Sequence, residues 1–286
     1  LFCPFGTPLL PRRGLPVVST FYDLQVLAYP HFFRPAERRQ RQAHLRQLQR
    51  QACLIAAISN FSRSEGIRHG LNPDRLRTIP IQMAAPSATH ANPPPLGLRS
   101  GCFLLYPANL WQHKNHELLF SAFAMARQQG LPGDLTLVCT GDGQGRLDQL
   151  RQLAAGLQIE KHLQLPGYVS AAELEALYSH CLAVVFPSLY EGFGMPIIEA
   201  MARGLPVCCS NSTALAEVAG DAALLVDPRH PQQIAEALLR LAGDAELRQR
   251  LSQRGRKRAV LYTQPTAMAQ AYWQLLTDAH HAAPRR

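Results

Sequence analysis

The sequence predicts an α/β protein made of two doubly wound units with parallel sheets. From Cys102 onward, short apolar runs alternate with amphipathic helical segments, which is the pattern of βα units whose sheet is covered on both faces. A shorter set of apolar runs precedes a proline-rich stretch that contains three consecutive prolines at 93–95. The chain has 286 residues, enough for two domains of ordinary size. We therefore expect an incomplete first domain at 1–90, a linker at 91–100 and a second domain at 101–286.

The composition favours a cytoplasmic protein that acts on anionic ligands. Hydrophobic residues make up 47% of the chain, but no run reaches the length of a membrane span and the first residues lack a signal pattern. The seven cysteines are scattered without a CxxC pair, as expected of reduced, buried thiols. The net charge of +9 is compatible with nucleic acid, an anionic membrane surface or acidic substrates. Nucleic acid is the least favoured partner, because no aromatic residues interleave the arginines for base stacking.

The first unit contains three expected strands and a basic helix. The strands are the apolar runs 15–20, 53–58 and 77–81. Residues 35–52 read as a helix rich in Arg and Gln, whose polar face is either solvated or turned toward the inner face of a membrane. Ser59 or Asn60 would cap the helix that follows the second strand.

The second unit shows a regular series of strands and helices. Strands are expected at 103–106, 135–139, 163–165, 183–186, 207–210 and 223–226. In doubly wound domains the ligand binds at the carboxyl ends of the strands. The last segment, 232–279, reads as helical throughout, with Trp273 buried against one of the two domains.

The stretch FPSLYEGFGMPIIEAMARGLPV, residues 186–207, reads as a strand, a glycine loop, a short helix and the next strand. Pro196 suits the first helical turn, and Gly204 suits the C-terminal cap. Backbone N–H groups and the helix dipole favour an anion at this helix start, and the glycines allow a phosphate to approach. Glu191 in the loop and Glu199 in the helix cannot share one helical face, so they should contact different parts of one ligand. On spacing alone, a tight connection with two solvated acids remains an equal alternative.

The segment EGFGMPIIEAMARGLPV resembles the signature of family 4 retaining glycosyltransferases, which have the GT-B fold. The flanking segments LPGYVSAAELEALYSHC and AEVAGDAALLVDP resemble the same family, and the likeness covers nearly the whole chain from about Leu15. The resemblance implies two Rossmann-like domains facing a cleft, with the last helix crossing back to the first. It also implies transfer of a sugar, with mannose as a candidate, from a nucleotide-sugar donor to a hydroxyl of a glycan or lipid-linked acceptor, without a metal or other cofactor.

Site residues follow from the resemblance position by position. Glu191 matches the glutamate that contacts the donor sugar, and Glu199 matches the one that binds the ribose. Lys114 matches a lysine near the diphosphate, whereas Asn109 stands where the family has an arginine. Tyr22 and Asp23 stand where the family has His then Asp. The expected catalytic residues are Glu191, Lys114, Tyr22 and Asp23. The expected nucleotide-sugar-binding residues are Glu199, Gly192, Phe193, Gly194, Met195, Pro196, Asn109, Gly141, Tyr168 and Val169.

Two other functions stay open at this point, namely a nucleotide-sugar-binding module without catalysis and a nucleotide-sugar epimerase or hydrolase. The sequence has no Asp-x-Asp pair for a metal–diphosphate, and His113 and His116 have no third zinc ligand nearby in sequence. Family members carry a longer first domain, so we expect an N-terminally truncated fragment. Its strands near Leu15 and Cys53 would lack neighbours, and it would aggregate and transfer sugar poorly.

Overall fold

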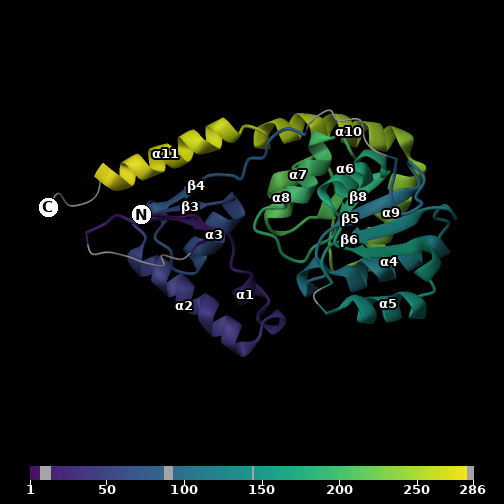
Figure 1. The fold of residues 1–286 in the computed structure, drawn as a ribbon, viewed down its shortest axis with the longest axis horizontal. Coiled ribbons are helices and arrows are strands. Elements are labelled where there is room, and N and C mark those ends of the chain that lie inside the picture. The colour runs from purple at the N-terminus through teal and green to yellow at the C-terminus, as the bar shows by residue number, and fades with distance from the viewer. Residues whose placement is uncertain (7–13, 87–92, 144, 282–286) are drawn as a thin grey trace. The chain divides into compact units, whose positions relative to one another are not determined.

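The computed structural model describes residues 1–6, 14–86, 93–143 and 145–281. Its contacts divide the chain into two compact units. Figure 1 shows the ribbon coloured by residue number, from purple at the N-terminus to yellow at the C-terminus. Unit 1 consists of Leu1–Ala84, Glu191–Phe193 and Tyr262–Arg286, and unit 2 of Ala85–Tyr190 and Gly194–Leu261. Two segments from the second half of the sequence therefore belong to unit 1. Residues 91 and 92 of the expected linker lie outside the described residues.

Unit 1 is built on a four-stranded parallel sheet in the order β1-β2-β3-β4. The strands are β1 (Phe2–Cys3), β2 (Val18–Phe21), β3 (Leu54–Ala57) and β4 (Leu76–Thr78). Val18 pairs with Phe2 on one side and with Leu54 on the other. The expectation that the strands near Leu15 and Cys53 lack neighbours is therefore wrong, because the first residues of the chain form a short strand beside β2.

The two faces of this sheet are covered from opposite ends of the sequence. On one face, Ile55 and Ala57 pack with Leu48 of α2 (Pro35–Gln51). On the other face, Ala56 packs with Leu275 of α11 (Pro265–His281). Alternation of side chains along β3 explains this division. The remaining elements of unit 1 are α1 (Gln25–Ala28), η1 (Pro30–Phe32), α3 (Asn60–Arg68) and η2 (Pro73–Arg75).

The C-terminal segment is helical, as predicted, and it consists of several successive helices. It contains α9 (Pro231–Gly243), α10 (Ala245–Ala259), η5 (Val260–Tyr262) and α11. The side chain of Asp244 caps α10 by accepting a hydrogen bond of 2.8 Å from the N–H of Leu247. Trp273 is 73% exposed, so its predicted burial is wrong. Tyr272 and Leu275 belong to the stripe that packs on unit 1, and Trp273 lies about 100° around the helix from Tyr272.

Unit 2 is built on a six-stranded parallel sheet in the order β10-β9-β8-β5-β6-β7. The strands are β5 (Phe103–Pro107), β6 (Thr136–Thr140), β7 (Leu163–Gly167), β8 (Ala183–Phe186), β9 (Val207–Ser210) and β10 (Leu224–Val226). The connecting helices are α4 (His116–Gln128), α5 (Leu147–Gly156), α6 (Ala171–His180), α7 (Met195–Ala202) and α8 (Thr213–Ala219), and η3 (Gln112–Lys114) and η4 (Glu160–His162) are single 3-10 turns.

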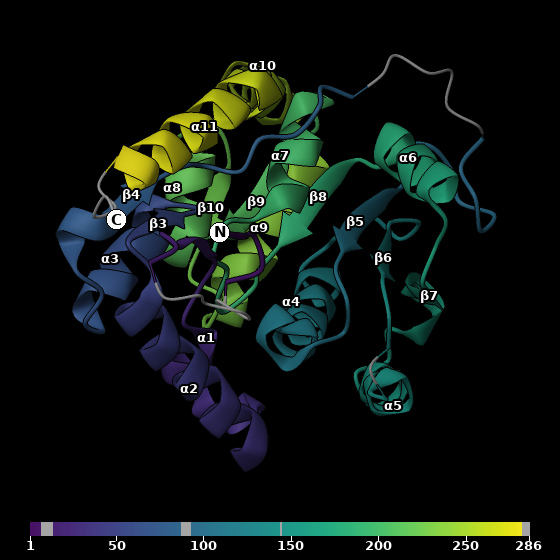
Figure 2. The same ribbon diagram turned by 60° about the vertical axis from the view of Figure 1, so that its left-hand side comes forward.

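The strand order reverses between β5 and β8. The chain first runs outward through β6 and β7, then returns to β8 and continues through β9 to β10. Right-handed crossovers consequently place α4 and α5 on one face and α6, α7 and α8 on the other, as Figure 2 shows. Helix α9 packs on α4, and α10 packs on α7. Ligands of doubly wound sheets bind at such a reversal, outside the carboxyl ends of the strands.

No helix in the described part of the chain has the length and apolar character needed to cross a membrane. Contact of the basic helix α2 with a membrane surface stays a prediction.

A pair of substitutions in α11 tests its packing on the sheet of unit 1. Leu275→Ala should lower the free energy of unfolding by about 2–5 kcal/mol, because it leaves a cavity under a buried side chain. Trp273→Ala should change it by no more than about 0.5 kcal/mol, because that side chain is exposed. Urea unfolding followed by circular dichroism measures both. Equal losses for the two variants would contradict the described orientation of α11.

Candidate functional site

Asn115 joins three loops at the strand reversal of unit 2. Its backbone is left-handed, with φ 64°, a conformation that asparagine tolerates better than most residues. Its buried side-chain amide donates to the carbonyl of Pro187 at 3.1 Å and to that of Pro228 at 2.7 Å. The loops after β5, β8 and β10 are thereby held together by one side chain.

Lys114 lies next to this joint, at the carboxyl end of β5. Its backbone carbonyl accepts a hydrogen bond of 2.6 Å from the hydroxyl of Tyr106. Its ammonium group lies over the ring of Phe186, the last residue of β8, 5.0 Å from the ring centroid. The N–H of Leu189 donates to the carbonyl of His113 at 2.7 Å. These contacts place a positive charge between the ends of the two strands that flank the reversal.

A cavity of about 290 Å³ opens at the carboxyl ends of β5, β6 and β7. It is lined by Pro107, Ala108, Asn109, Trp111, Lys114, Thr140, Gly141, Tyr168, Val169 and Leu174. Five of the predicted site residues, namely Asn109, Lys114, Gly141, Tyr168 and Val169, are thus brought together. Three further lining residues, Trp111, Thr140 and Leu174, are not among those predicted from the sequence. Trp111 could have been found from the sequence, because a tryptophan in a polar loop just after a strand indicates a ligand-binding position. Thr140 and Leu174 could not, because the sequence pattern indicates only that they belong to a strand and a helix.

Gly141 and Asn109 shape the wall of this cavity. Gly141 has φ 119°, and a Cβ atom there would lie 2.6 Å from the carbonyl oxygen of Ala108. The side-chain oxygen of Asn109 accepts a hydrogen bond of 2.9 Å from the N–H of Asp142. Asn109 therefore fixes the loop after β6 and supplies no positive charge.

Two aromatic side chains border the same cavity. Tyr168 is 82% exposed, and Trp111 is 44% exposed. Helix α6 begins directly after Val169 with a capping box, in which the side chains of Ser170 and Glu173 each bond the other residue's backbone. Exposed rings beside a cavity offer faces on which a planar or apolar part of a ligand can pack.

The glycine loop after β8 leads into α7 as predicted. Gly194 has φ 108° and is the N-cap of α7, where no side chain supplies a capping hydrogen bond. A Cβ atom on Gly194 would lie 2.5 Å from a methyl group of Leu215, so only glycine fits. Met195 and Pro196 open the helix.

Glu191–Phe193 belong to unit 1, where two serine hydroxyls hold them. Ser59 donates to the carbonyl of Gly192 at 2.8 Å, and Ser62 donates to the same oxygen at 3.2 Å. Ser59 also caps α3 by accepting from the N–H of Ser62 at 2.9 Å. A Cβ atom on Gly192 would lie 2.6 Å from the carbonyl oxygen of Tyr22. Phe193 is buried, edge-on to Tyr262.

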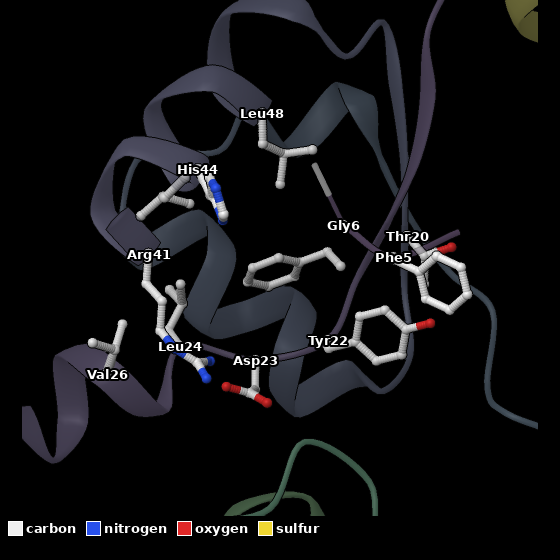
Figure 3. Close-up of a pocket in the computed structure, with 12 residues that line it drawn as sticks. Phe5, Gly6, Thr20, Tyr22, Asp23, Leu24, Val26, Arg41, His44 and Leu48 are labelled. Atoms are coloured by element: carbon white, nitrogen blue, oxygen red, sulfur yellow. The ribbon is translucent and has the colours of Figure 1, made fainter. Parts of the chain in front are cut away.

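A second cavity, of about 160 Å³, lies in unit 1 at the carboxyl ends of β1 and β2 (Figure 3). Its lining includes Tyr22 and Asp23 from the loop after β2, and Arg41 and His44 from α2. The hydroxyl of Tyr22 donates to the carbonyl of Pro4 at 2.7 Å, and burial raises the pKa of Tyr22 above its usual 10.0. Tyr22 is therefore a hydrogen-bond donor near neutral pH and not a base. The carboxylate of Asp23 accepts from the N–H of Gln25 at 2.9 Å.

Glu199 lies outside the lining of both cavities, as does Glu191. Glu199 is half-buried on α7 and accepts a hydrogen bond of 2.8 Å from the hydroxyl of Tyr178 on α6. Tyr178 is not among the site residues predicted from the sequence, because a contact between side chains of two different helices leaves no mark in the sequence pattern.

His116 is fully buried at the start of α4, and neither ring nitrogen has a hydrogen-bond partner among the described residues. Its ring stacks on Tyr106, with centroids 4.7 Å apart. Burial lowers the pKa of His116 to about 3, and the charges of Arg146 and Lys114 act in the same direction. In the described ranges, no group of three or more His, Cys, Asp or Glu side chains is arranged to hold a metal ion.

Comparison with known proteins assigns the family. The family described as "Glycosyl transferases group 1" matches residues 99–258, more than half of the chain. The chain belongs to this family. The fold class is GT-B, as predicted: a solved structure of Anabaena HepE with UDP and glucose matches 92% of the chain and 72% of HepE, with a TM-score of 0.77 at 20% identity.

Two curated relatives of this group 1 chain are mannosyltransferases. The O-antigen chain mannosyltransferase B of Escherichia coli is 33% identical over 86% of the chain and 66% of its own length. The MMP alpha-(1->4)-mannosyltransferase of Mycolicibacterium hassiacum is 38% identical over 38% of the chain and 27% of its own length. The chain thus spans just under two thirds of the first relative and about a quarter of the second.

The buried His116 makes stability depend on pH. Its pKa in the folded chain lies below the value of about 6.5 expected when unfolded, so the unfolded chain takes up the proton first as the pH falls. The free energy of unfolding therefore does not depend on His116 above pH ~6.5. Between pH ~6.5 and pH 3 it should fall by up to about 1.4 kcal/mol per pH unit, because protonation of His116 favours the unfolded chain.

The matched variant is His116→Phe, which keeps a ring on Tyr106 but has no proton to gain. The difference in free energy of unfolding between variant and wild type should shift in favour of the variant as the pH falls from 7 to 5. Urea unfolding at several pH values measures it. A difference that does not change with pH would show that His116 is not held neutral.

Proposed function

We propose that this chain takes part in transferring a hexosyl group, with mannosyl as the first candidate, from a nucleoside diphosphate sugar to a hydroxyl group of a glycan or lipid-linked saccharide, with retention at the anomeric carbon. The mannosyl candidate is supported by the names of the two curated relatives.

The observation that carries the proposal is the position of a cation that both lines a cavity and lies over the end of the strand that precedes α7. Lys114 lines the cavity and lies over the end of β8, and the loop after β8 runs into the N-terminus of α7. A lysine and a helix N-terminus both stabilise phosphate groups. The exposed rings of Trp111 and Tyr168 border the cavity in which we place the nucleobase.

The acids and unit 1 complete the proposed roles. Glu199 accepts ribose hydroxyls, and Glu191 contacts the donor sugar. The cavity of unit 1 that contains Tyr22 and Asp23 receives the acceptor. The hydroxyl oxygen of Tyr22, whose proton is donated to the carbonyl of Pro4, accepts a hydrogen bond from it.

In the proposed reaction, the bond between the anomeric carbon and the diphosphate oxygen breaks. A new bond forms between that carbon and the acceptor oxygen, and the proton of the acceptor hydroxyl passes to a phosphate oxygen of the departing nucleoside diphosphate. Negative charge grows on the departing nucleoside diphosphate. Lys114 and the N–H groups at the start of α7 stabilise that charge. Stabilising the charge that develops in the transition state is usually the largest single contribution to lowering the activation barrier.

A binding module without catalysis is the second candidate. It is favoured by Asn109, which occupies the position of the family arginine and is engaged in a neutral hydrogen bond to the N–H of Asp142. One of the two cations expected near the diphosphate is therefore absent.

The deciding experiment measures donor turnover with and without acceptor. Purified chain is screened by thermal shift against GDP-mannose, UDP-glucose and ADP-glucose, and nucleotide release is then followed with a mannoside acceptor. A transferase gives a shift and acceptor-dependent release, and NMR of the product shows the retained anomeric configuration. Release without acceptor indicates a hydrolase, and a new sugar nucleotide an epimerase. A shift without turnover indicates the binding module, and no shift with any sugar nucleotide contradicts the proposal.

Substitution of Lys114 tests its role at the diphosphate. Lys114→Met should weaken binding of the stabilising nucleoside diphosphate by roughly 10- to 150-fold, the equivalent of about 1.5–3 kcal/mol for a hydrogen bond to a charged group. The control is Lys161→Met, which removes an exposed lysine in η4. Calorimetric affinities that fall equally in both variants would reflect net charge and remove Lys114 from the site.

We further propose that binding and transfer need no metal ion. The motivation is the absence of an Asp-x-Asp pair in the sequence together with the position of Lys114. EDTA should leave both the affinity for the nucleoside diphosphate and the rate unchanged. Restoration of a lost activity by added magnesium or manganese would contradict this part of the proposal.

A further inference from the structure

Tyr178 and Glu199 form a hydrogen-bonded pair between α6 and α7. Tyr178 is 2% exposed, and its hydroxyl lies 2.8 Å from Oε2 of Glu199. Burial raises the pKa of Tyr178 well above its ordinary value of 10.0, and the charge of Glu199 and their hydrogen bond raise it further. The phenol therefore stays protonated, and it donates while the carboxylate accepts.

The ring of Tyr178 is itself held in place. The guanidinium of Arg203 stacks on it, 4.8 Å from the ring centroid. Arg203 forms an ion pair with Glu175, in which its Nε and Nη2 donate to the two carboxylate oxygens. Its Nη1 donates to the backbone carbonyl of Glu199 at 2.8 Å. Within the described residues, the ion pair of Arg203 is made with Glu175 and not with the carboxylate of Glu199.

Helix α6 links this pair to the cavity of unit 2. Leu174 lines the cavity, and Tyr178 follows it by one helical turn on the same side of α6. The capping box at Ser170 fixes the start of the helix one residue after Val169 of the cavity wall. Tyr178 thus lies on the helix that also borders the cavity of the proposed ligand.

We propose that Tyr178 is a positioning residue for Glu199. It binds Oε2 and so orients Oε1 toward a vicinal diol, the pair of ribose hydroxyls of the nucleotide. In the described part of the chain, no other hydrogen-bond donor reaches the Glu199 carboxylate. A carboxylate oxygen has two lone pairs, so Oε1 can accept from both hydroxyls of the diol. This inference rests on the assignment of Glu199 to the ribose under the proposed function.

The test is a double-mutant cycle with Tyr178→Phe, Glu199→Gln and both together. Tyr178→Phe keeps the ring under Arg203 and removes only the hydroxyl. Calorimetry measures the affinity for GDP and UDP, and for their 2′,3′-dideoxy forms, which lack the diol. Melting temperatures show that each variant folds.

We expect Tyr178→Phe to weaken ribonucleotide binding about 3- to 30-fold, the range that corresponds to loss of one hydrogen bond. It should leave dideoxynucleotide binding unchanged, and the double variant should bind no more weakly than Glu199→Gln alone. The control is Tyr272→Phe, which removes a tyrosine hydroxyl bonded to Thr20 in unit 1 and should leave all nucleotide affinities unchanged.

The outcomes separate the two claims. If Glu199→Gln leaves ribonucleotide affinity unchanged, the assignment of Glu199 to the ribose fails, and the role of Tyr178 fails with it. If Glu199→Gln weakens binding but Tyr178→Phe does not, only the positioning role is overturned. Equal effects of Tyr178→Phe on ribonucleotides and dideoxynucleotides, or additive effects with Glu199→Gln, would overturn it as well, because they indicate a general loss of structure.

Discussion

The reversal of strand order between β5 and β8 is the constraint on which the arrangement of unit 2 depends. Crossovers leave the sheet toward opposite faces at this point, so the two strand-end loops meet without a helix between them. Asn115 joins them with its left-handed backbone and its two amide donors, which satisfy carbonyls of Pro187 and Pro228. Each such carbonyl left buried without a donor would cost about 1–3 kcal/mol. Lys114 directly precedes Asn115, so the hydrogen bonds of Asn115 also fix the position of the Lys114 backbone.

Unit 1 depends on a different constraint, which is the return of the chain at its C-terminal end. A parallel sheet needs both faces covered, and the segment between β2 and β3 supplies helix α2 for one face only. Helix α11 covers the other face through Leu275, and Tyr272 adds a hydrogen bond of 3.2 Å to Thr20. Segments about 250 residues apart in sequence thereby share one hydrophobic core.

Periodicity in the sequence predicted the strands of unit 2 well, since β8 and β9 agree with the predicted runs to the residue. Periodicity also placed the glycine loop and Gly141 at a strand end, and the resemblance supplied four other residues that line the cavity, namely Asn109, Lys114, Tyr168 and Val169. The two-residue strand β1 carries no detectable period, and the apolar stripe of α11 is too weak to show that Trp273 lies outside it. Contacts such as Ser59 with Gly192 join residues 133 positions apart and depend on tertiary packing.

The partner of Glu199 is a neutral phenol, and this choice has chemical consequences. An arginine in that place would bind both carboxylate oxygens at once and compensate the charge. Arg203 is close enough to stack on Tyr178, yet it pairs with Glu175. A tyrosine donates one hydrogen bond, which fixes the carboxylate without neutralising it. A ligand with paired hydroxyl donors therefore suits the half-buried carboxylate better than an anionic one.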